Sequence, residues 1–248
     1  MIVAYEGSAY HGWQRQAVGI DTVQLRIELA GTKVMGHRVI LHGAGRTDAG
    51  VHASGQVANF HTPNFAIPLK GMRRAINSRL PNDIAIVSAA DVNDGFQASR
   101  SAIGKTYRYR IWRAPIRPVM QAGQVWHYWR PLDAEPMIQA AARIVGTHDF
   151  RGFTTSAETR LNTTRTIFRC EVADMGSELL VTVQGDGFLY NMVRNIVGTL
   201  TEIGRGRWKP NHIDKIIATR DRDIAGPTAP PDGLSLVCVH YKNEGMKV

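Results

Sequence analysis

The 248-residue sequence lacks the cysteine and histidine spacings on which most metal and disulfide chemistry depends. Its two cysteines, Cys170 and Cys238, form no CxxC pair and lie in strand-like runs, so we expect buried free thiols rather than a disulfide bridge. Neither HExxH nor an H-x-E motif followed by CxxC occurs, and His42, His52 and His61 lack metal-ligand spacing. These absences disfavour zinc chemistry, and we expect no bound metal.

Two further kinds of sequence are missing. No GxxxxGK[ST] motif occurs, so a loop that cradles the phosphates of ATP is not supported. No apolar run approaches the length of a membrane span, and no signal-peptide pattern opens the chain. We therefore expect a globular protein of the cytoplasm that does not enter a membrane.

Positive charge, by contrast, is in excess. Lysine and arginine together number 30 against 21 acidic residues, which gives a formal net charge of +9. Many of these residues gather in three clusters: Arg73, Arg74 and Arg79; Lys105, Arg108, Arg110, Arg113 and Arg117; Arg205, Arg207 and Lys209. Such clusters attract phosphate backbones. Charge alone, however, neither separates RNA from DNA nor excludes an ordinary solvated cationic surface.

Hydrophobic periodicity predicts helices mixed with antiparallel strands along the whole chain, which favours an α+β fold. The predicted helices are residues 25–30, 68–80, 133–145 and 189–203, and the predicted strands are 2–5, 38–42, 56–61, 84–87, 96–112, two within 165–185, and 236–241. Prolines and arginines interrupt this pattern at 113–131. We interpret that segment as a linker between an N-terminal half, 1–112, and a C-terminal half, 132–248. The polar segment 220–233 is predicted to be a mobile loop.

One acidic residue lies in an unusual setting. Asp48 follows Arg46 by two residues within GRTDAGVH, residues 45–52, and apolar strand-like segments flank this motif on both sides. Gly45 and Gly50 permit backbone conformations that other residues avoid. Asp48 is therefore expected on a tight turn between two buried elements, either as an ordinary turn residue or as a nucleophile.

Several separate stretches closely resemble the tRNA pseudouridine synthase A family, in the family's order. They are residues 4–14 (AYEGSAYHGWQ), 45–53 (GRTDAGVHA), 105–109 (KTYRY), 192–198 (MVRNIVG) and 233–236 (GLSL). The resemblance covers nearly the whole chain. It implies two ferredoxin-like halves joined into one continuous, mostly antiparallel sheet, with helices on one face and a central active-site cleft.

The resemblance also implies a function: isomerisation of uridine to pseudouridine at nucleotides 38–40 of the tRNA anticodon stem-loop, by a homodimer that needs neither cofactor nor metal. Five residues match positions with known roles in the family. Asp48 matches the catalytic aspartate, Arg194 the arginine that pairs with it, Arg46 a residue that contacts RNA phosphate and helps to extrude the target nucleotide, Tyr107 the tyrosine that stacks on the target uracil, and Leu234 a leucine that packs against the pocket.

The residues by themselves leave alternatives open. Either Arg46 or Arg194 could keep the carboxylate of Asp48 charged, and Arg194 could instead form a purely structural ion pair. Tyr107 and Leu234 could be simple core residues, and Trp13 could contact RNA or cover a sheet edge.

The residues by themselves are compatible with two other functions. One is a non-catalytic RNA-binding module, which uses stacking and charge alone. The other is one half of an aspartic protease dyad, although Gly45 and Arg46 replace the apolar lead-in which that fold requires.

Overall fold

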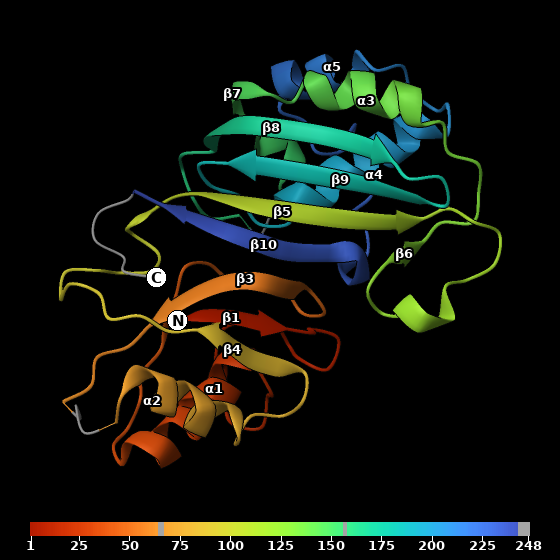
Figure 1. Ribbon diagram of the computed structural model, residues 1–248. Helices are drawn as coiled ribbons and strands as arrows, with labels where there is room; N and C mark the ends of the chain where they lie inside the picture. Colours follow the sequence, from red (N-terminus) through yellow and green to blue (C-terminus); the bar gives the residue numbers. More distant parts are fainter. Residues whose placement is uncertain (64–66, 156–157, 243–248) are drawn as a thin grey trace. The chain divides into compact units, whose positions relative to one another are not determined.

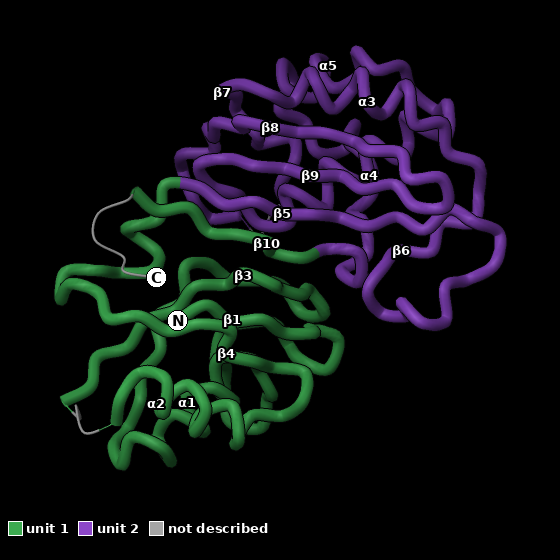
Figure 2. The backbone as a smooth tube through the Cα atoms, viewed as in Figure 1, with its two compact units in different colours: residues 1–103, 235–248 green, residues 104–234 purple. Residues whose placement is uncertain are grey.

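The computed structural model describes residues 1–63, 67–155 and 158–242. Within them the chain forms ten strands, five α-helices and three short 3-10 helices. The chain divides into two compact units (Figure 2): unit 1 comprises Met1–Ile103 with Ser235–Val248, and unit 2 comprises Gly104–Leu234. The last strand of the sequence therefore belongs to the unit that the N-terminal residues build.

Unit 1 is a sheet with two helices. Its strands are β1 (Ile2–Tyr5), β2 (His42–Gly43), β3 (His52–Asn59), β4 (Ile84–Ser88) and β10 (Leu234–Tyr241), in the order β4-β1-β3-β10 with β2 beside β3. The β3–β10 pair is parallel and the other pairs are antiparallel. The helices α1 (Val23–Met35) and α2 (Leu69–Asn77) lie together on one side of this sheet (Figure 1).

The ends of α1 follow from its sequence. The hydroxyl of Thr22 accepts a hydrogen bond from the backbone N–H of Leu25 at 3.4 Å, which caps the first turn. The helix ends at Gly36, whose φ of +73° lies in the left-handed region that favours glycine. Buried Val23 and Ile27 fix the face that α1 turns inward.

The strand predicted at 38–42 does not form, apart from its last residue, His42. Val39 and Leu41 are buried, but their backbone N–H groups bond to side chains of α1 instead of a neighbouring strand. Val39 donates to the hydroxyl of Thr32 and Leu41 to the carboxylate of Glu28, each at 3.0 Å. Side-chain acceptors thus satisfy this buried backbone without a ladder.

Unit 2 is a larger sheet with three helices. The strands are β5 (Ala102–Trp112), β6 (Trp126–His127), β7 (Gly146–Asp149), β8 (Thr164–Asp174) and β9 (Glu178–Gly185), in the order β5-β9-β8-β7 with β6 parallel to β5 and the remaining pairs antiparallel. The helices are α3 (Ala134–Ala142), α4 (Met192–Gly204) and α5 (His212–Thr219); the 3-10 helices are η1 (Val119–Gln121), η2 (Arg151–Phe153) and η3 (Pro231–Gly233).

The core of unit 2 lies between its sheet and its helices. Alternate residues of β9 (Leu179, Val181 and Val183) are fully buried, whereas the residues between them are half-buried. Helix α3 contacts both β8 and α4, so the helices cover the buried face (Figure 1). The α+β class and the mostly antiparallel pairing predicted from the sequence are thereby confirmed.

Two segments expected to lie between elements have structure of their own. Residues 113–131 belong to unit 2 and contain η1 and β6. Residues 220–233 were predicted to be a mobile loop, and that prediction is wrong for their central part, which packs against α4. A Cβ atom on Gly198 of α4 would lie only 1.7 Å from the carbonyl oxygen of Pro227, and the N–H of Gly226 donates to the hydroxyl of Thr199 at 2.9 Å.

Both cysteines are free thiols, as predicted. Cys170 is buried, and burial raises the pKa of its thiol to about 12, whereas Cys238 is only half-buried. Among the described residues, no helix has the length and hydrophobicity needed to cross a bilayer.

Candidate active site

Asp48 lies on a tight turn between β2 and β3, as the sequence predicted. The backbone N–H of Val51 closes the turn by donating to the carbonyl of Asp48 at 3.1 Å, and Gly50 adopts a φ of +79°. The side chain of Arg46 is exposed two residues earlier, whereas Asp48 is half-buried. The turn therefore carries an acidic and a basic side chain of different solvent exposure.

Residues 6–14, which follow β1, form backbone hydrogen bonds with this turn. The N–H of Trp13 donates to the carbonyl of Thr47 at 3.1 Å, and the N–H of Gly50 donates to the carbonyl of Tyr10 at 3.3 Å. A Cβ atom on Gly7 would lie 2.1 Å from the carbonyl oxygen of Val51, so only glycine permits this approach. Backbone contacts thus fix Thr47 before Asp48 and Gly50 after it.

Two polar side chains add to the same support. The hydroxyl of buried Tyr5 lies 2.8 Å from that of Thr47, and the amide of Gln56 donates to the carbonyl of Gly45 at 2.8 Å. Burial raises the pKa of the Tyr5 phenol well above its usual range, so this hydroxyl stays protonated. The turn is therefore bonded at Gly45, Thr47 and Gly50.

Sequence reasoning missed how His52 and Trp13 contribute. The N–H of Gly7 donates to Nδ1 of His52 at 2.9 Å, which ties the supporting segment to the start of β3. Trp13 is only 2% exposed and its indole packs on Gly43, where an added Cβ atom would lie 2.4 Å from Nε1. Trp13 therefore packs within unit 1 and presents almost no surface.

Tyr107 lies in unit 2, on β5. Its ring is 8% exposed and contacts the ring of Phe188 edge to face, with centroids 5.0 Å apart. Tyr109, two residues further on the same face, is fully buried and its hydroxyl donates to the carbonyl of Pro230 at 2.7 Å. Tyr109 is thus a core residue, while Tyr107 retains a small exposed surface.

Arg194 and Leu234 lie in the same region of unit 2. Arg194 occupies the first turn of α4 and is half-buried; its Nε donates to the carbonyl of Ala229 at 2.7 Å and Nη1 donates to the side chain of Asn191 at 3.0 Å. Leu234, which follows η3, is 5% exposed. Three of the five predicted site residues (Tyr107, Arg194 and Leu234) therefore belong to unit 2, and Arg46 and Asp48 share one turn of unit 1.

Asn195 joins several segments of unit 2 by hydrogen bonds, a role that was not predicted from the sequence. It is fully buried in α4; its amide donates to the carbonyl of Phe153 at 2.8 Å, and its side-chain oxygen accepts from the hydroxyl of Thr228 at 2.7 Å and from Arg222 at 3.1 Å. The signal was a polar residue at a buried position of an apolar helix, where a hydrogen-bonded role is the rule.

The basic clusters differ in how many of their charges are paired. Arg110 and Arg113 bond to Glu178 and Asp174, and Arg205 and Arg207 share Glu202. Within the described residues, Arg108 and Arg117 make no ion pair, and no three His, Cys, Asp or Glu side chains gather as a metal site would require. The unpaired arginines are the better candidates for contacts with a polyanion.

Comparisons with known proteins show the family of this chain. The family model described as tRNA pseudouridine synthase matches residues 1–99 and 140–242. The chain is 42% identical over 242 residues to tRNA pseudouridine synthase A of Acinetobacter baumannii (strain ACICU), an alignment that covers 98% of this chain and 91% of that one. It is 43% identical over 241 residues to tRNA pseudouridine synthase A of Thermoanaerobacter sp. (strain X514), covering 97% and 98% of the two chains. The chain therefore belongs to the tRNA pseudouridine synthase family.

Proposed function

We propose that this protein isomerises uridine to pseudouridine in tRNA, at nucleotides 38–40 of the anticodon stem-loop, with Asp48 as the nucleophile and without a metal or cofactor. Membership of the family supports the reaction and its substrate. The observation that carries the assignment of Asp48 is the turn itself, because backbone contacts from the segment 6–14 hold it on both sides of that residue.

The proposed reaction requires an ionised carboxylate that is held in a fixed position. The reaction breaks the bond from C1′ to N1 of the base and forms a bond from C1′ to C5, and the proton lost at C5 is balanced by one gained at a ring nitrogen. No electron is gained or lost overall. An ionised carboxylate can attack either the sugar or the base, and a rigid turn limits the geometries from which it does so.

Unit 2 is proposed to supply the other groups. Arg194 keeps a fixed direction because Ala229 and Asn191 accept two of its hydrogen bonds, which suits a cation that stabilises a carboxylate. The face of the Tyr107 ring would stack on the extruded uracil, while Leu234 would give the pocket an apolar wall. Arg46, exposed beside Asp48, would contact an RNA phosphate. Action as a cytoplasmic homodimer is proposed from the family resemblance.

The direct test is to incubate the purified protein with an unmodified anticodon stem-loop and to map pseudouridine chemically. We expect modification at nucleotides 38, 39 or 40 and at no other uridine of a full-length transcript. Tight binding without conversion would instead support the non-catalytic RNA-binding module. Conversion elsewhere in the tRNA would retain the reaction but overturn the substrate position.

A second test addresses the proposed absence of a metal. Chelation of divalent cations after the RNA has folded should leave the single-turnover rate unchanged. Loss of activity that is restored by one added transition metal, and not by magnesium, would contradict the metal-free mechanism.

A further inference from the structure

Lys105 lies beside Tyr107 in unit 2 but has no role in the mechanism given above. The two residues are two positions apart on β5, so their side chains leave the same face of the strand. Lys105 is half-buried. On that face of β5, Lys105 is therefore the neighbour of the residue whose ring is proposed to stack on the uracil.

The charge of Lys105 is not compensated. Among the described residues, no carboxylate forms an ion pair with its ammonium and none of the hydrogen bonds involves it. Burial lowers the pKa of Lys105, and the nearby guanidinium of Arg160 lowers it further. A partly buried charge without an acidic partner is a candidate for contact with a charged ligand.

Arg160 is joined to the same site through Phe188. Its Nη1 donates to the carbonyl of Phe188 at 3.2 Å, and the ring of Phe188 contacts Tyr107. The other donors of Arg160 bond to Glu158, whose carboxylate also accepts from the N–H of Tyr190 at 3.0 Å. Arg160 therefore has a fixed direction, and Glu158 balances its charge.

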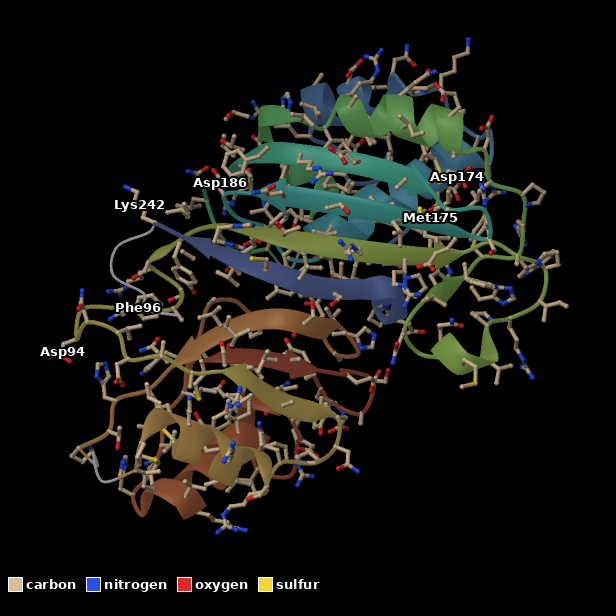
Figure 3. The ribbon with its side chains drawn as sticks, in the orientation of Figure 1. Asp94, Phe96, Asp174, Met175, Asp186 and Lys242 are labelled. Atoms are coloured by element: carbon tan, nitrogen blue, oxygen red, sulfur yellow. The ribbon has the colours of Figure 1, made fainter. Side chains whose placement is uncertain are left out.

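A third cation completes the cluster. Arg165 donates to the carbonyls of Thr164 and Asn162, and both burial and the charge of Arg160 lower its pKa. The nearby carboxylate of Asp186 accepts from the N–H of Thr166 at 3.0 Å. Figure 3 shows Asp186 at the opposite end of the β8–β9 hairpin from Asp174 and Met175. Lys105, Arg160 and Arg165 against Glu158 and Asp186 leave one positive charge in excess.

We propose that Lys105, flanked by Arg160, forms a subsite for one backbone phosphodiester of the bound RNA, next to the nucleotide that stacks on Tyr107. A phosphodiester carries a single negative charge, which equals the excess of the cluster, and its oxygens accept hydrogen bonds from an ammonium and a guanidinium. This inference rests on the proposed function. Lys105 would act by positioning the extruded nucleotide, and takes no part in bond making.

A chemical double-mutant cycle tests the contact. One partner is changed by Lys105→Met, which keeps the length of the side chain and removes its charge. The other is changed by replacing each phosphodiester that flanks the target uridine, one at a time, with a neutral methylphosphonate. Affinity and single-turnover rate are measured for all four combinations of protein and RNA. Lys215→Met, at an exposed position of α5, is the control for loss of one lysine charge.

At one linkage, we expect Lys105→Met and the methylphosphonate each to lower kcat/KM roughly ten- to a hundredfold, as loss of a charge-assisted hydrogen bond does. The two changes together should cost little more than either alone. Lys105→Arg should retain most of the parent value, and Lys215→Met should show the same loss at each linkage as the parent protein does. Losses that multiply at every linkage would overturn the subsite.

Conversion by the parent protein distinguishes a failure of the proposed function from a failure of the subsite alone. If the parent protein did not convert the natural stem-loop, the reaction itself would be wrong, whatever the cycle showed for binding. If the parent converted the stem-loop and the cycle showed no coupling, only the subsite would be wrong. Melting temperatures of the Lys105 variants are measured alongside; Lys105→Gln replaces Lys105→Met if the latter is destabilised.

Discussion

The two units support their candidate site residues by different means. In unit 1, backbone groups hold the Asp48 turn: N–H to carbonyl bonds join residues 6–14 to it, and Gly7 approaches Val51 where no side chain would fit. In unit 2, polar side chains hold the region of Arg194, through Asn195, Thr199 and Arg222 on and around α4. The first arrangement depends on the absence of side chains and the second on their presence.

This difference determines which substitutions each unit tolerates. A backbone-held turn should accept many changes of exposed side chains but no added atom at the point of closest approach. A network of buried side chains should instead be sensitive to the loss of any one polar group, since its partners then remain buried without hydrogen bonds.

The largest effect is expected for Gly7→Ala. The added methyl group would meet the carbonyl oxygen of Val51, and two backbones cannot separate without moving the Asp48 turn. We expect a loss of about 3–5 kcal/mol in the free energy of unfolding, in the upper range for overpacking. Thermal melting measures it. Gly95→Ala is the matched control, because nothing lies within 4 Å of the position of its Cβ atom. Equal melting temperatures for the two variants would contradict the account of unit 1.

Asn195→Ala tests unit 2 in the same way. It leaves the carbonyl of Phe153, the hydroxyl of Thr228 and one N–H of Arg222 without their partner. We expect a loss of about 2–4 kcal/mol, from buried polar groups left unsatisfied. Asn195→Asp should also destabilise, since it removes the donor to Phe153. If chemical denaturation showed Asn195→Ala to be as stable as the parent, the network would not hold unit 2.

The pH dependence of stability provides a further test of the side-chain contacts in unit 2. Hydrogen bonds from Arg160 and from the N–H of Tyr190 lower the pKa of Glu158 to about 2, from a usual 4.5. A depressed folded-state pKa means that this carboxylate stabilises the protein above about pH 4.5, and that the contribution disappears as the pH falls towards 2. Glu158→Gln should therefore cost about 1–3 kcal/mol at pH 7 and progressively less below pH 4.5.

The control for that experiment is Glu171→Gln. Its exposed carboxylate pairs with the exposed Arg169, and such pairs contribute little to stability. Urea denaturation at several pH values between 3 and 7 measures both variants. A destabilisation by Glu158→Gln that stayed constant over this range would show that the charge of the carboxylate does not matter.

The smallest effect concerns the salt dependence of RNA binding. Arg108 and Arg110 are close in sequence, but Arg110 is paired with Glu178 and Arg108 makes no ion pair within the described residues. If Arg108 contacts a phosphate, Arg108→Gln should reduce the magnitude of the negative slope of log affinity against log salt by about 0.7–0.9. Arg110→Gln should change the slope less. The opposite ranking would show that the ion pair opens when RNA binds.

The sequence predicted the elements whose signals are local. Helix α1 begins after Thr22 because its hydroxyl caps the first turn, and Asp48 lies on the turn that its flanking glycines and apolar segments indicated. What it could not predict depends on distant partners. Residues 38–41 resemble a strand, yet Glu28 and Thr32 bond to their backbone, and β10 joins unit 1 although almost the whole of unit 2 precedes it.

The same distinction applies to the candidate site. Family motifs predicted Asp48, Arg194 and Tyr107 as site residues, and the structure adds what surrounds each of them. The burial of Trp13 against Gly43 and the packing of Gly226 on Gly198 each require two segments far apart in sequence to meet. The polar residues, glycines and prolines of 220–233 suggested a mobile loop. Composition could not show that this segment hydrogen-bonds to Asn195 and Thr199 of α4.

The central claim is that the carboxylate of Asp48 performs the reaction from a turn that exists independently of it. Single-turnover conversion of an anticodon stem-loop by Asp48→Asn tests this most directly, together with RNA affinity and melting temperature; Asp94→Asn, in an exposed loop of the same unit (Figure 3), is the control. We predict a rate lower by more than about a thousandfold, as for other essential nucleophiles, with affinity and stability near those of the parent. Conversion by Asp48→Asn at a rate close to that of Asp94→Asn would contradict the claim.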